Sequence, residues 1–248
     1  MNDNIIEIEN LSKSYKRKKA LDKISLNIKR GSITGLFGEN GAGKTTLMKL
    51  LTNQIRPDEG EIVINGQALI FNSKVNASLG CLLERPSLYP YLTAHQHLLL
   101  FNILNHEDQG SLIEELMKAY KLDDFKDVKS KDYSLGMKQR LGLAQAELSG
   151  REILILDEPF NGLDPVSVNK FRERILYLKE KGMTIILSSH LIRELEDLID
   201  NLVIISKGKL VSSISLDDFM KDKDTSLEKE ILKIMEVWYG KFIKIWIV

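Results

Sequence analysis

Apolar and polar residues alternate in two segments near the start of the chain, residues 5–9 and 24–28. An alternation with a period of two is typical of antiparallel strands that bury one face. Residues 33–37 are more uniformly apolar and lead into a glycine-rich turn, after which Leu47, Leu50 and Leu51 recur at helical spacing. The pattern therefore predicts antiparallel strands and then a strand–loop–helix unit. Residues 61–64 and 79–83 predict two more strands.

The pattern changes between about residues 86 and 149, where apolar residues recur at helical spacing. Leu98 and Phe101 mark one predicted helix, and Leu112, Leu116 and Tyr120 mark another. Residues 108–110 and 121–132 are expected to be connectors. We expect this part of the chain to form an inserted helical subdomain.

Strands and helices alternate again after residue 150. Residues 153–156 and 184–187 are apolar runs, typical of parallel strands covered on both faces. A helix is predicted over residues 165–181, because a proline stands near its start and a glycine just past its end. A further helix is expected over residues 191–198. Residues 202–206 and 210–213 predict a hairpin.

This order predicts an α/β fold in which helices flank a mixed, mainly parallel sheet, with loops gathered at the carboxyl ends of the strands. The predicted fold also contains an N-terminal antiparallel β subdomain and the inserted α-helical subdomain. We expect one domain over residues 1–248. Its parts are a core of residues 1–85 and 150–213, the helical subdomain of residues 86–149 and a C-terminal extension of residues 214–248.

Composition narrows the function only slightly. The chain has 248 residues, of which 43% are hydrophobic and 28% charged, a balance that argues against a disordered or membrane-embedded protein. Because 35 basic residues face 35 acidic ones, net charge gives no reason to expect nucleic-acid binding. The one cysteine, Cys81, fits a reducing compartment. We expect neither a secretory signal nor an apolar run of the roughly 20 residues that span a bilayer.

The glycine-rich turn fits the phosphate-binding pattern G-x-x-x-x-G-K-[ST], between a strand and a helix as that pattern requires. The matching residues are Gly38, Glu39, Asn40, Gly41, Ala42, Gly43, Lys44 and Thr45. Backbone N–H groups and the start of the helix would surround phosphate oxygens there. Lys44 would contact the β- and γ-phosphates, and the Thr45 hydroxyl would bind Mg²⁺. We therefore predict a P-loop NTPase that binds ATP and Mg²⁺ through residues 38–46, Thr46 included.

An acidic pair follows the buried strand of residues 153–156. Asp157 would emerge at the carboxyl end of this strand and reach Mg²⁺ directly or through water. Glu158 points elsewhere and could polarise the attacking water. The alternative is an acidic pair that merely caps the strand.

These residues, taken with several others, resemble the nucleotide-binding subunits of ABC transporters over about residues 4–213. Residues 133–140, YSLGMKQR, resemble the LSGGQ signature segment of that family, although Tyr133, Leu135 and Met137 depart from its consensus. Residues 161–164 resemble its D-loop, and His190 its switch histidine. Tyr15 stands where the family usually places an aromatic that stacks on adenine, although aromatics near a strand end are often packing residues.

The resemblance implies that two chains pack head to tail. Ser134 and the N–H groups around Gly136 open a predicted helix, where they would close on the γ-phosphate held by the partner chain. Ser134 could also be a simple helix N-cap. Glu158 would then orient water for attack, and His190 would hold the transferring phosphoryl group.

One residue departs from the family in an informative way. ABC subunits normally carry a glutamine after the strand that leads into the helical subdomain, and Glu84 stands there. A carboxylate offers only acceptors and adds negative charge beside ATP, yet it could serve as a catalytic group or a metal ligand. With this version of the signature, Glu84 resembles the bacitracin-export and lantibiotic-immunity branch. Replacing Glu84 by Gln is expected to keep nucleotide binding and to alter the coupling of hydrolysis to transport.

The expected function is therefore ATP hydrolysis that powers a membrane exporter of peptide antibiotics. The expected partners are integral membrane permease subunits and a second ATP-binding subunit, which would place the chain in the cytoplasm at the inner face of the membrane. The alternative is a soluble ABC ATPase that serves iron–sulfur cluster biogenesis. The apolar C-terminal tail is expected either to contact the membrane or permease or to pack as a strand on the body.

Overall fold

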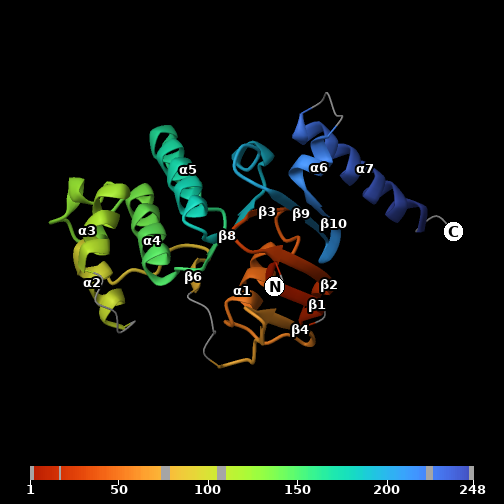
Figure 1. Ribbon diagram of the computed structural model, residues 1–248, viewed down its shortest axis with the longest axis horizontal. Coiled ribbons are helices and arrows are strands. Elements are labelled where there is room, and N and C mark those ends of the chain that lie inside the picture. Colours follow the sequence, from red (N-terminus) through yellow and green to blue (C-terminus); the bar gives the residue numbers. More distant parts are fainter. Residues whose placement is uncertain (1–2, 17, 74–78, 105–109, 222–225, 246–248) are drawn as a thin grey trace.

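The computed structural model describes residues 3–16, 18–73, 79–104, 110–221 and 226–245. Two β-sheets form its centre, and a group of helices extends from one of them (Figure 1). The strands are β1 (Asn4–Tyr15), β2 (Lys18–Lys29), β3 (Ile33–Phe37), β4 (Glu59–Ile64), β5 (Gln67–Ala68), β6 (Leu79–Leu82), β7 (Ile153–Leu156), β8 (Thr184–Ser189), β9 (Asn201–Ser206) and β10 (Lys209–Ser215). The helices are α1 (Lys44–Leu51), α2 (Ala94–Leu104), α3 (Gly110–Ala119), α4 (Leu135–Ser149), α5 (Pro165–Glu180), α6 (Leu216–Met220) and α7 (Leu227–Ile245). Short 3₁₀ helices are η1 (Asp123–Phe125), η2 (Ser130–Asp132) and η3 (Ile192–Glu194).

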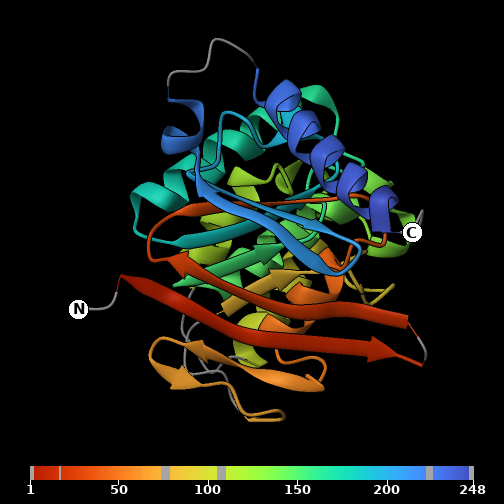
Figure 2. The same ribbon diagram turned by 90° about the vertical axis from the view of Figure 1, so that its right-hand side faces the viewer.

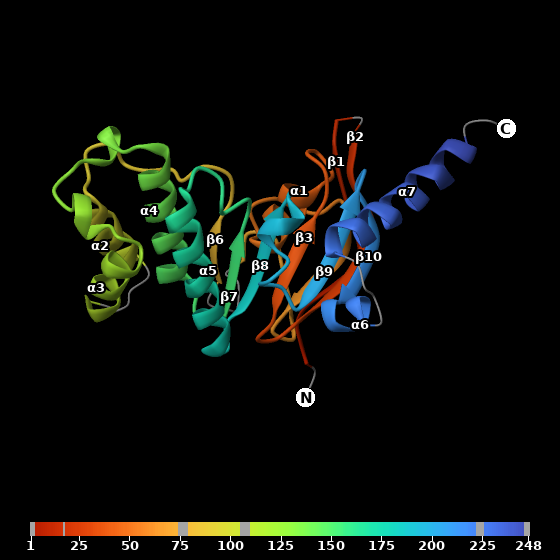
Figure 3. The same ribbon diagram turned by 90° about the horizontal axis from the view of Figure 1, so that it is seen from above.

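The larger sheet has the strand order β10-β9-β3-β8-β7-β6, and Figure 3 shows these strands side by side. Neighbours from β9 to β6 are parallel, while β10 is antiparallel to β9 at the edge. The predicted mixed, mainly parallel sheet of a P-loop NTPase is thus confirmed. Because β3, β6, β7 and β8 run in the same direction, the loops that follow them meet at one edge.

The smaller sheet is antiparallel, with the order β2-β1-β4-β5, and lies below the larger one in Figure 2. Strands β1 and β2 each have 12 residues, so they extend well beyond the alternating segments 5–9 and 24–28. The β1–β2 register shifts several times, and Asn10 and Lys23 have left-handed φ angles of 49° and 50°. Bulges of this kind let pairing continue where the alternation is broken, so the pattern alone underestimated both strands.

Two apolar cores lie on opposite faces of the larger sheet. Helix α1 packs between the two sheets through Leu47, Met48, Leu50 and Leu51. Strand β7 contributes to both cores: Ile153 and Ile155 face α1, while Leu154 and Leu156 face the helices on the other side. A strand covered in this way must be apolar at every position, which is why residues 153–156 show no alternation.

Helices α2, α3 and α4 form the predicted helical region and share the second core with α5. Of the two expected connectors, residues 121–132 hold η1 and η2, whereas residues 108 and 109 lie outside the described residues. Helix α4 begins at Leu135, directly after Ser134, and α5 spans Pro165–Glu180 as predicted. The boundaries of the parts at residues 85, 149 and 213 remain our proposal.

The expected helix over residues 191–198 is wrong. The chain there forms the single 3₁₀ helix η3 followed by turns. The buried residues Ile192, Leu195 and Leu198 recur every third position, which matches the three residues per turn of a 3₁₀ geometry. The spacing by itself could not distinguish this arrangement from an α-helix.

The C-terminal segment differs from one expectation. Helix α7 continues to Ile245, so the alternative in which this tail packs as a strand is wrong. Leu227, Ile231 and Met235 are buried against the body, and Figures 1 and 3 show the far end of α7 extending away from it. Among the described residues, no helix has the length and apolar character that crossing a bilayer requires.

Candidate functional site

The loop between β3 and α1 has the shape that a phosphate-binding loop needs. Gly41 and Gly43 adopt φ angles of 80° and 115°, which favour glycine. A Cβ atom at Gly38 would lie 2.2 Å from the carbonyl oxygen of Ile205, so only glycine fits this close approach. The loop ends at the N-terminus of α1, where backbone N–H groups lack partners within the helix.

Lys44 is held inside this loop. Its side chain is only 6% exposed, and Nζ donates a hydrogen bond to the carbonyl oxygen of Gly38 at 2.6 Å. The same ammonium group lies 3.7 Å from Oε1 of Glu158. A cation is therefore positioned between the loop and the end of β7.

Asp157 is buried at the carboxyl end of β7, where hydroxyl groups surround it. The hydroxyl of Thr45 donates to Oδ2 at 2.5 Å, and the hydroxyl of Ser188 donates to Oδ1. Ser188 also accepts a hydrogen bond from the backbone N–H of Glu158 at 2.9 Å. Sequence reasoning missed this role of Ser188; its only signal was a polar residue, fully buried here, at the end of an apolar strand.

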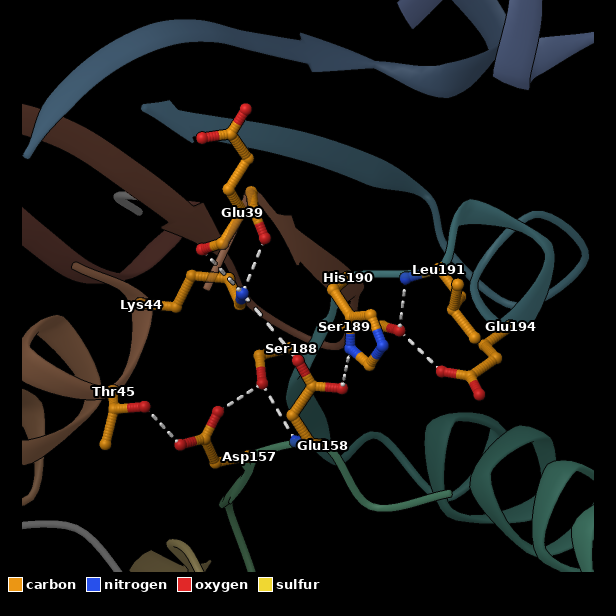
Figure 4. Close-up of polar contacts among 11 residues, drawn as sticks. Glu39, Lys44, Thr45, Asp157, Glu158, Ser188, Ser189, His190, Leu191 and Glu194 are labelled. Atoms are coloured by element: carbon orange, nitrogen blue, oxygen red, sulfur yellow. Dashed lines mark hydrogen bonds and ion pairs between the residues drawn. The ribbon is translucent and has the colours of Figure 1, made fainter. Parts of the chain in front are cut away.

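Glu158 faces His190 and Lys44 (Figure 4). Its Oε2 lies 2.8 Å from Nδ1 of His190, and because an ionised carboxylate only accepts, Nδ1 carries the hydrogen in this contact. The backbone of Glu158 is left-handed, with φ at 49°. Such a conformation costs a residue other than glycine about 1 kcal/mol or more, and strain of this kind concentrates at functional sites.

Lys44, Thr45, Asp157 and Glu158 border one cavity of about 290 Å³, whereas Gly38, Ala42, Ser188 and His190 are not among its lining residues. We call it the P-loop cavity, and its lining residues are Tyr15, Lys18, Ala20, Glu39, Asn40, Gly41, Gly43, Lys44, Thr45, Thr46, Asp157 and Glu158. The structure thus brings together most of the predicted cofactor-binding residues. Tyr15, one of these lining residues, is 46% exposed.

Thr45 and Asp157 form a suitable donor pair for a small, hard cation. Mg²⁺ prefers oxygen ligands, and the hydroxyl and carboxylate oxygens here already lie 2.5 Å apart at the mouth of the phosphate loop. The residues therefore fit the metal predicted from the sequence.

Ser134 and Gly136 do not line the P-loop cavity. Ser134 is the N-cap of α4, where its side chain accepts from the N–H of Met137 at 3.2 Å. Gly136 lies against the D-loop: a Cβ atom there would meet the carbonyl oxygen of Gly162 at 2.9 Å. Within one chain the structure therefore does not bring these two predicted residues to the cavity.

Glu84 also lies outside the cavity lining. It follows β6 at the same sheet edge, with a left-handed φ of 61°, and its carboxylate contacts Lys49 on α1. The structure therefore does not bring Glu84 to Thr45 and Asp157, and its predicted part in catalysis and metal binding remains a proposal.

The sequence pattern that defines the ABC transporter family matches residues 21–161 of the chain, more than half of its length. The chain belongs to the ABC transporter family. This ABC subunit is accordingly an ATP-binding, ATP-hydrolysing protein, as the resemblance of its motifs implied. Tyr15 and His190 lie outside the matched residues.

Several curated relatives are similar over most of their length. The chain is 39% identical to the bacitracin transport ATP-binding protein BcrA of Bacillus licheniformis, over 92% of the chain and 75% of the relative. It is 36% identical to the lantibiotic transport ATP-binding protein SrtF of Streptococcus pyogenes, over 84% of the chain and 89% of the relative. It is also 40% identical to the uncharacterized ABC transporter ATP-binding protein YcbN of Bacillus subtilis, over 86% of the chain and 70% of the relative. These relatives do not support the iron–sulfur alternative.

Solved structures agree with the fold. An ATP-binding subunit of an ABC transporter superposes with a TM-score of 0.83 at 28% identity and covers 93% of this chain and 99% of its own. The dimeric ATP-binding cassette MJ0796, solved in a post-hydrolysis state with ADP and Pi, has a TM-score of 0.75 at 23% identity, over 85% of this chain and 98% of its own. The second likeness shows the fold alone.

Proposed function

We propose that this ABC subunit supplies the power for an exporter of peptide antibiotics of the bacitracin or lantibiotic type. The observation that carries the ATPase part of this proposal is the contact of Glu158 with both His190 and Lys44 at the edge of the P-loop cavity. The cargo class rests on the similarity to BcrA and SrtF and on the glutamate at position 84.

ATP would bind with its adenine against Tyr15 and its phosphates in the loop of residues 38–46. Lys44 would exchange its contact with the Gly38 carbonyl for contacts with the β- and γ-phosphate oxygens. Thr45 and Asp157 would hold Mg²⁺, which when bound neutralises phosphate charge and polarises the bond that breaks.

Glu158 would accept the proton of the attacking water, and its contact with His190 would fix the direction of its carboxylate. Because Nδ1 donates to Glu158, His190 would donate to an oxygen of the transferring phosphoryl group through Nε2 when the ring carries a second hydrogen as the imidazolium. Ser134 and the N–H groups around Gly136 of a second chain would close the site from the opposite side.

A groove next to Glu84 would receive the membrane permease. It has a volume of about 440 Å³ and is bordered by Leu83, Arg85, Pro86 and Phe101 among others. Gln145 also borders it, and the amide nitrogen of this buried side chain has no hydrogen-bond partner among the described residues. This docking would hold the chain at the inner face of the membrane.

Two experiments test the proposal. First, the purified chain should hydrolyse ATP with Mg²⁺, and Lys44→Ala should weaken ATP binding by about tenfold or more, because a charged contact to the phosphates is lost. Equal binding by both proteins would contradict the assigned cavity.

Second, the gene should be deleted from the source cells and restored as the wild type or as Glu158→Gln. Growth is then measured in bacitracin and in a lantibiotic such as nisin. The wild type alone should restore resistance to one of these peptides. If deletion leaves sensitivity to both unchanged, the proposed cargo class is wrong, while the ATPase assignment stands on the first experiment.

A further inference from the structure

An ion pair joins the loop after β6 to the helix that follows the phosphate loop. Nζ of Lys49 donates to Oε1 of Glu84 at 2.7 Å. Lys49 follows Thr45 by four residues on α1, so both side chains lie on one face of the helix. The hydrogen bond to Glu84 is the main cause that raises the pKa of Lys49, and the nearby charge of Asp157 adds to it. The ammonium group is therefore charged and within electrostatic reach of the proposed metal site.

A contribution to folding stability does not explain why Lys49 and Glu84 form this ion pair. The side chain of Lys49 is 30% exposed and that of Glu84 62%, and ion pairs this exposed add little to stability. The backbone of Glu84, meanwhile, has the unfavourable φ of 61°. The ion pair instead determines where the negative charge of the Glu84 carboxylate lies.

Acidic side chains at this sheet edge are each held by a partner. Asp157 has the hydroxyls of Thr45 and Ser188, and Glu158 has the cation of Lys44. Glu84 would be a further carboxylate near the polyphosphate of a nucleotide, and Lys49 is a cation in contact with it. An amide in its place would carry no charge to compensate.

We propose that Lys49 is a positioning residue that makes a glutamate at position 84 compatible with nucleotide binding. It draws the Glu84 carboxylate onto α1, so that this charge does not turn towards the phosphates of bound nucleotide. The inference rests on the proposed function, because it presupposes ATP in the P-loop cavity. It differs from a simpler role in which Lys49 attracts phosphate independently of Glu84.

The two roles are separated by a double-mutant cycle of the wild type, Lys49→Met, Glu84→Gln and the double variant. The probe is N-methylanthraniloyl-ATP in excess EDTA, and the readout is its dissociation constant, not hydrolysis. Lys49→Met should weaken binding about five- to tenfold in the wild-type background, since the carboxylate is released towards the phosphates. In the Glu84→Gln background the same substitution should cost about twofold or less, because no charge is released.

Lys49→Arg should restore binding to within about twofold of the wild type, since the charge is kept. Lys233→Met, which removes an exposed lysine on α7, is the control for lost net charge and should leave binding unchanged. Thermal melting of every variant checks that it is folded.

An equal loss from Lys49→Met in both backgrounds would overturn the inference and leave Lys49 as an independent charge. So would the absence of any loss. In either case the wild type still binds the probe, so the proposed function survives; a wild type that fails to bind it would overturn both.

Discussion

Glu158 shows how much a single side chain depends on its neighbours. Its carboxylate touches a cation on one side and a histidine on the other, and its strained backbone directs it away from Asp157, one residue earlier. These adjacent acidic residues therefore have different surroundings. Asp157 accepts from two hydroxyls, as suits a metal site. Glu158 borders the cavity and contacts the His190 ring and the Lys44 ammonium group. The proposed division of labour follows from these surroundings.

Glu158→Gln tests this division. An amide keeps the size of the side chain and cannot accept the proton of water, so the turnover number should fall on the order of 10²- to 10³-fold. The affinity for ATP should stay within about threefold, since the phosphates are held by the loop and Lys44. Steady-state hydrolysis and equilibrium binding measure the two quantities.

Glu173→Gln provides the matched control, because Glu173 is exposed on α5 and outside the cavity lining. Its turnover number should equal that of the wild type. Wild-type turnover in Glu158→Gln would show that another group activates the water.

The sequence predicted these residues because each lies in a short motif whose chemistry is local. Lys44, Thr45 and Asp157 meet because parallel strands end at one edge, which the order of elements already implied. Ser188 and the Glu84–Lys49 pair were not foreseen. Both depend on which side chains face each other across neighbouring elements, and no spacing within the chain encodes that.

Helices α3, α4 and α5 are joined by a buried charge network. Arg174 on α5 donates from Nε to Oε2 of Glu147 on α4 at 3.0 Å, and from Nη2 to Oε1 of Glu115 on α3 at 2.8 Å. The hydroxyl of Tyr120 donates to Oε2 of Glu147 at 2.8 Å, and burial raises the pKa of this tyrosine well above its usual range. Because α4 begins at the signature segment and α5 at the D-loop, the network holds these two segments in one body.

Arg174→Met should therefore destabilise the fold by about 3–5 kcal/mol, because Glu147 would remain buried without its cation. Arg193→Met is the control: Arg193 forms an exposed pair with Glu228, and its loss should cost less than about 1 kcal/mol. Urea unfolding at neutral pH gives both values. If Arg174→Met and Arg193→Met lowered the free energy of unfolding by the same small amount, water would have to reach Glu147 in the folded protein.

His97 on α2 fixes the loop that precedes this helix. Its Nε2 accepts from the N–H of Tyr89 at 2.9 Å, and its Nδ1 contacts the carbonyl oxygen of Thr93 at 3.0 Å. The first contact requires a neutral ring, and burial lowers the pKa of His97 below its ordinary value. The unfolded chain therefore binds this proton more readily than the folded one.

Stability from the neutral ring is fully present above the unfolded pKa, near 6.5, and is lost as the pH falls through the lower folded pKa. His97→Gln removes this titration. At pH 8 it should be less stable than the wild type by about 1–3 kcal/mol, because buried hydrogen bonds are lost. The difference should narrow as the pH falls below 6.5. Unfolding curves at several pH values check this, and a constant difference would show that His97 does not titrate on unfolding.

At the level of elements, periodicity predicted well where packing is regular and poorly where it is not. The apolar runs of β7 and β8 and the helix α5 were foreseen because burial on two faces and end signals at proline and glycine are strong. The 3₁₀ turn of η3 and the long, bulged strands β1 and β2 were not. In those places tertiary contacts override the local pattern.

The whole molecule separates the two halves of the proposed active site. The P-loop cavity holds the residues for phosphate, metal and water, while Ser134 and Gly136, at the start of α4, are not among its lining residues. As the resemblance to ABC subunits implies, we propose that a second chain presents its Ser134 and Gly136 to the nucleotide held in this cavity. Hydrolysis would therefore require two chains.

The rate of ATP hydrolysis per molecule, measured over a roughly thousandfold range of chain concentration, tests this requirement most directly. If two chains must close on the nucleotide, the rate per molecule rises with concentration as pairs of chains form and then reaches a plateau. A rate per molecule that stays constant down to the lowest dilution, in a preparation that is monomeric throughout, would contradict it.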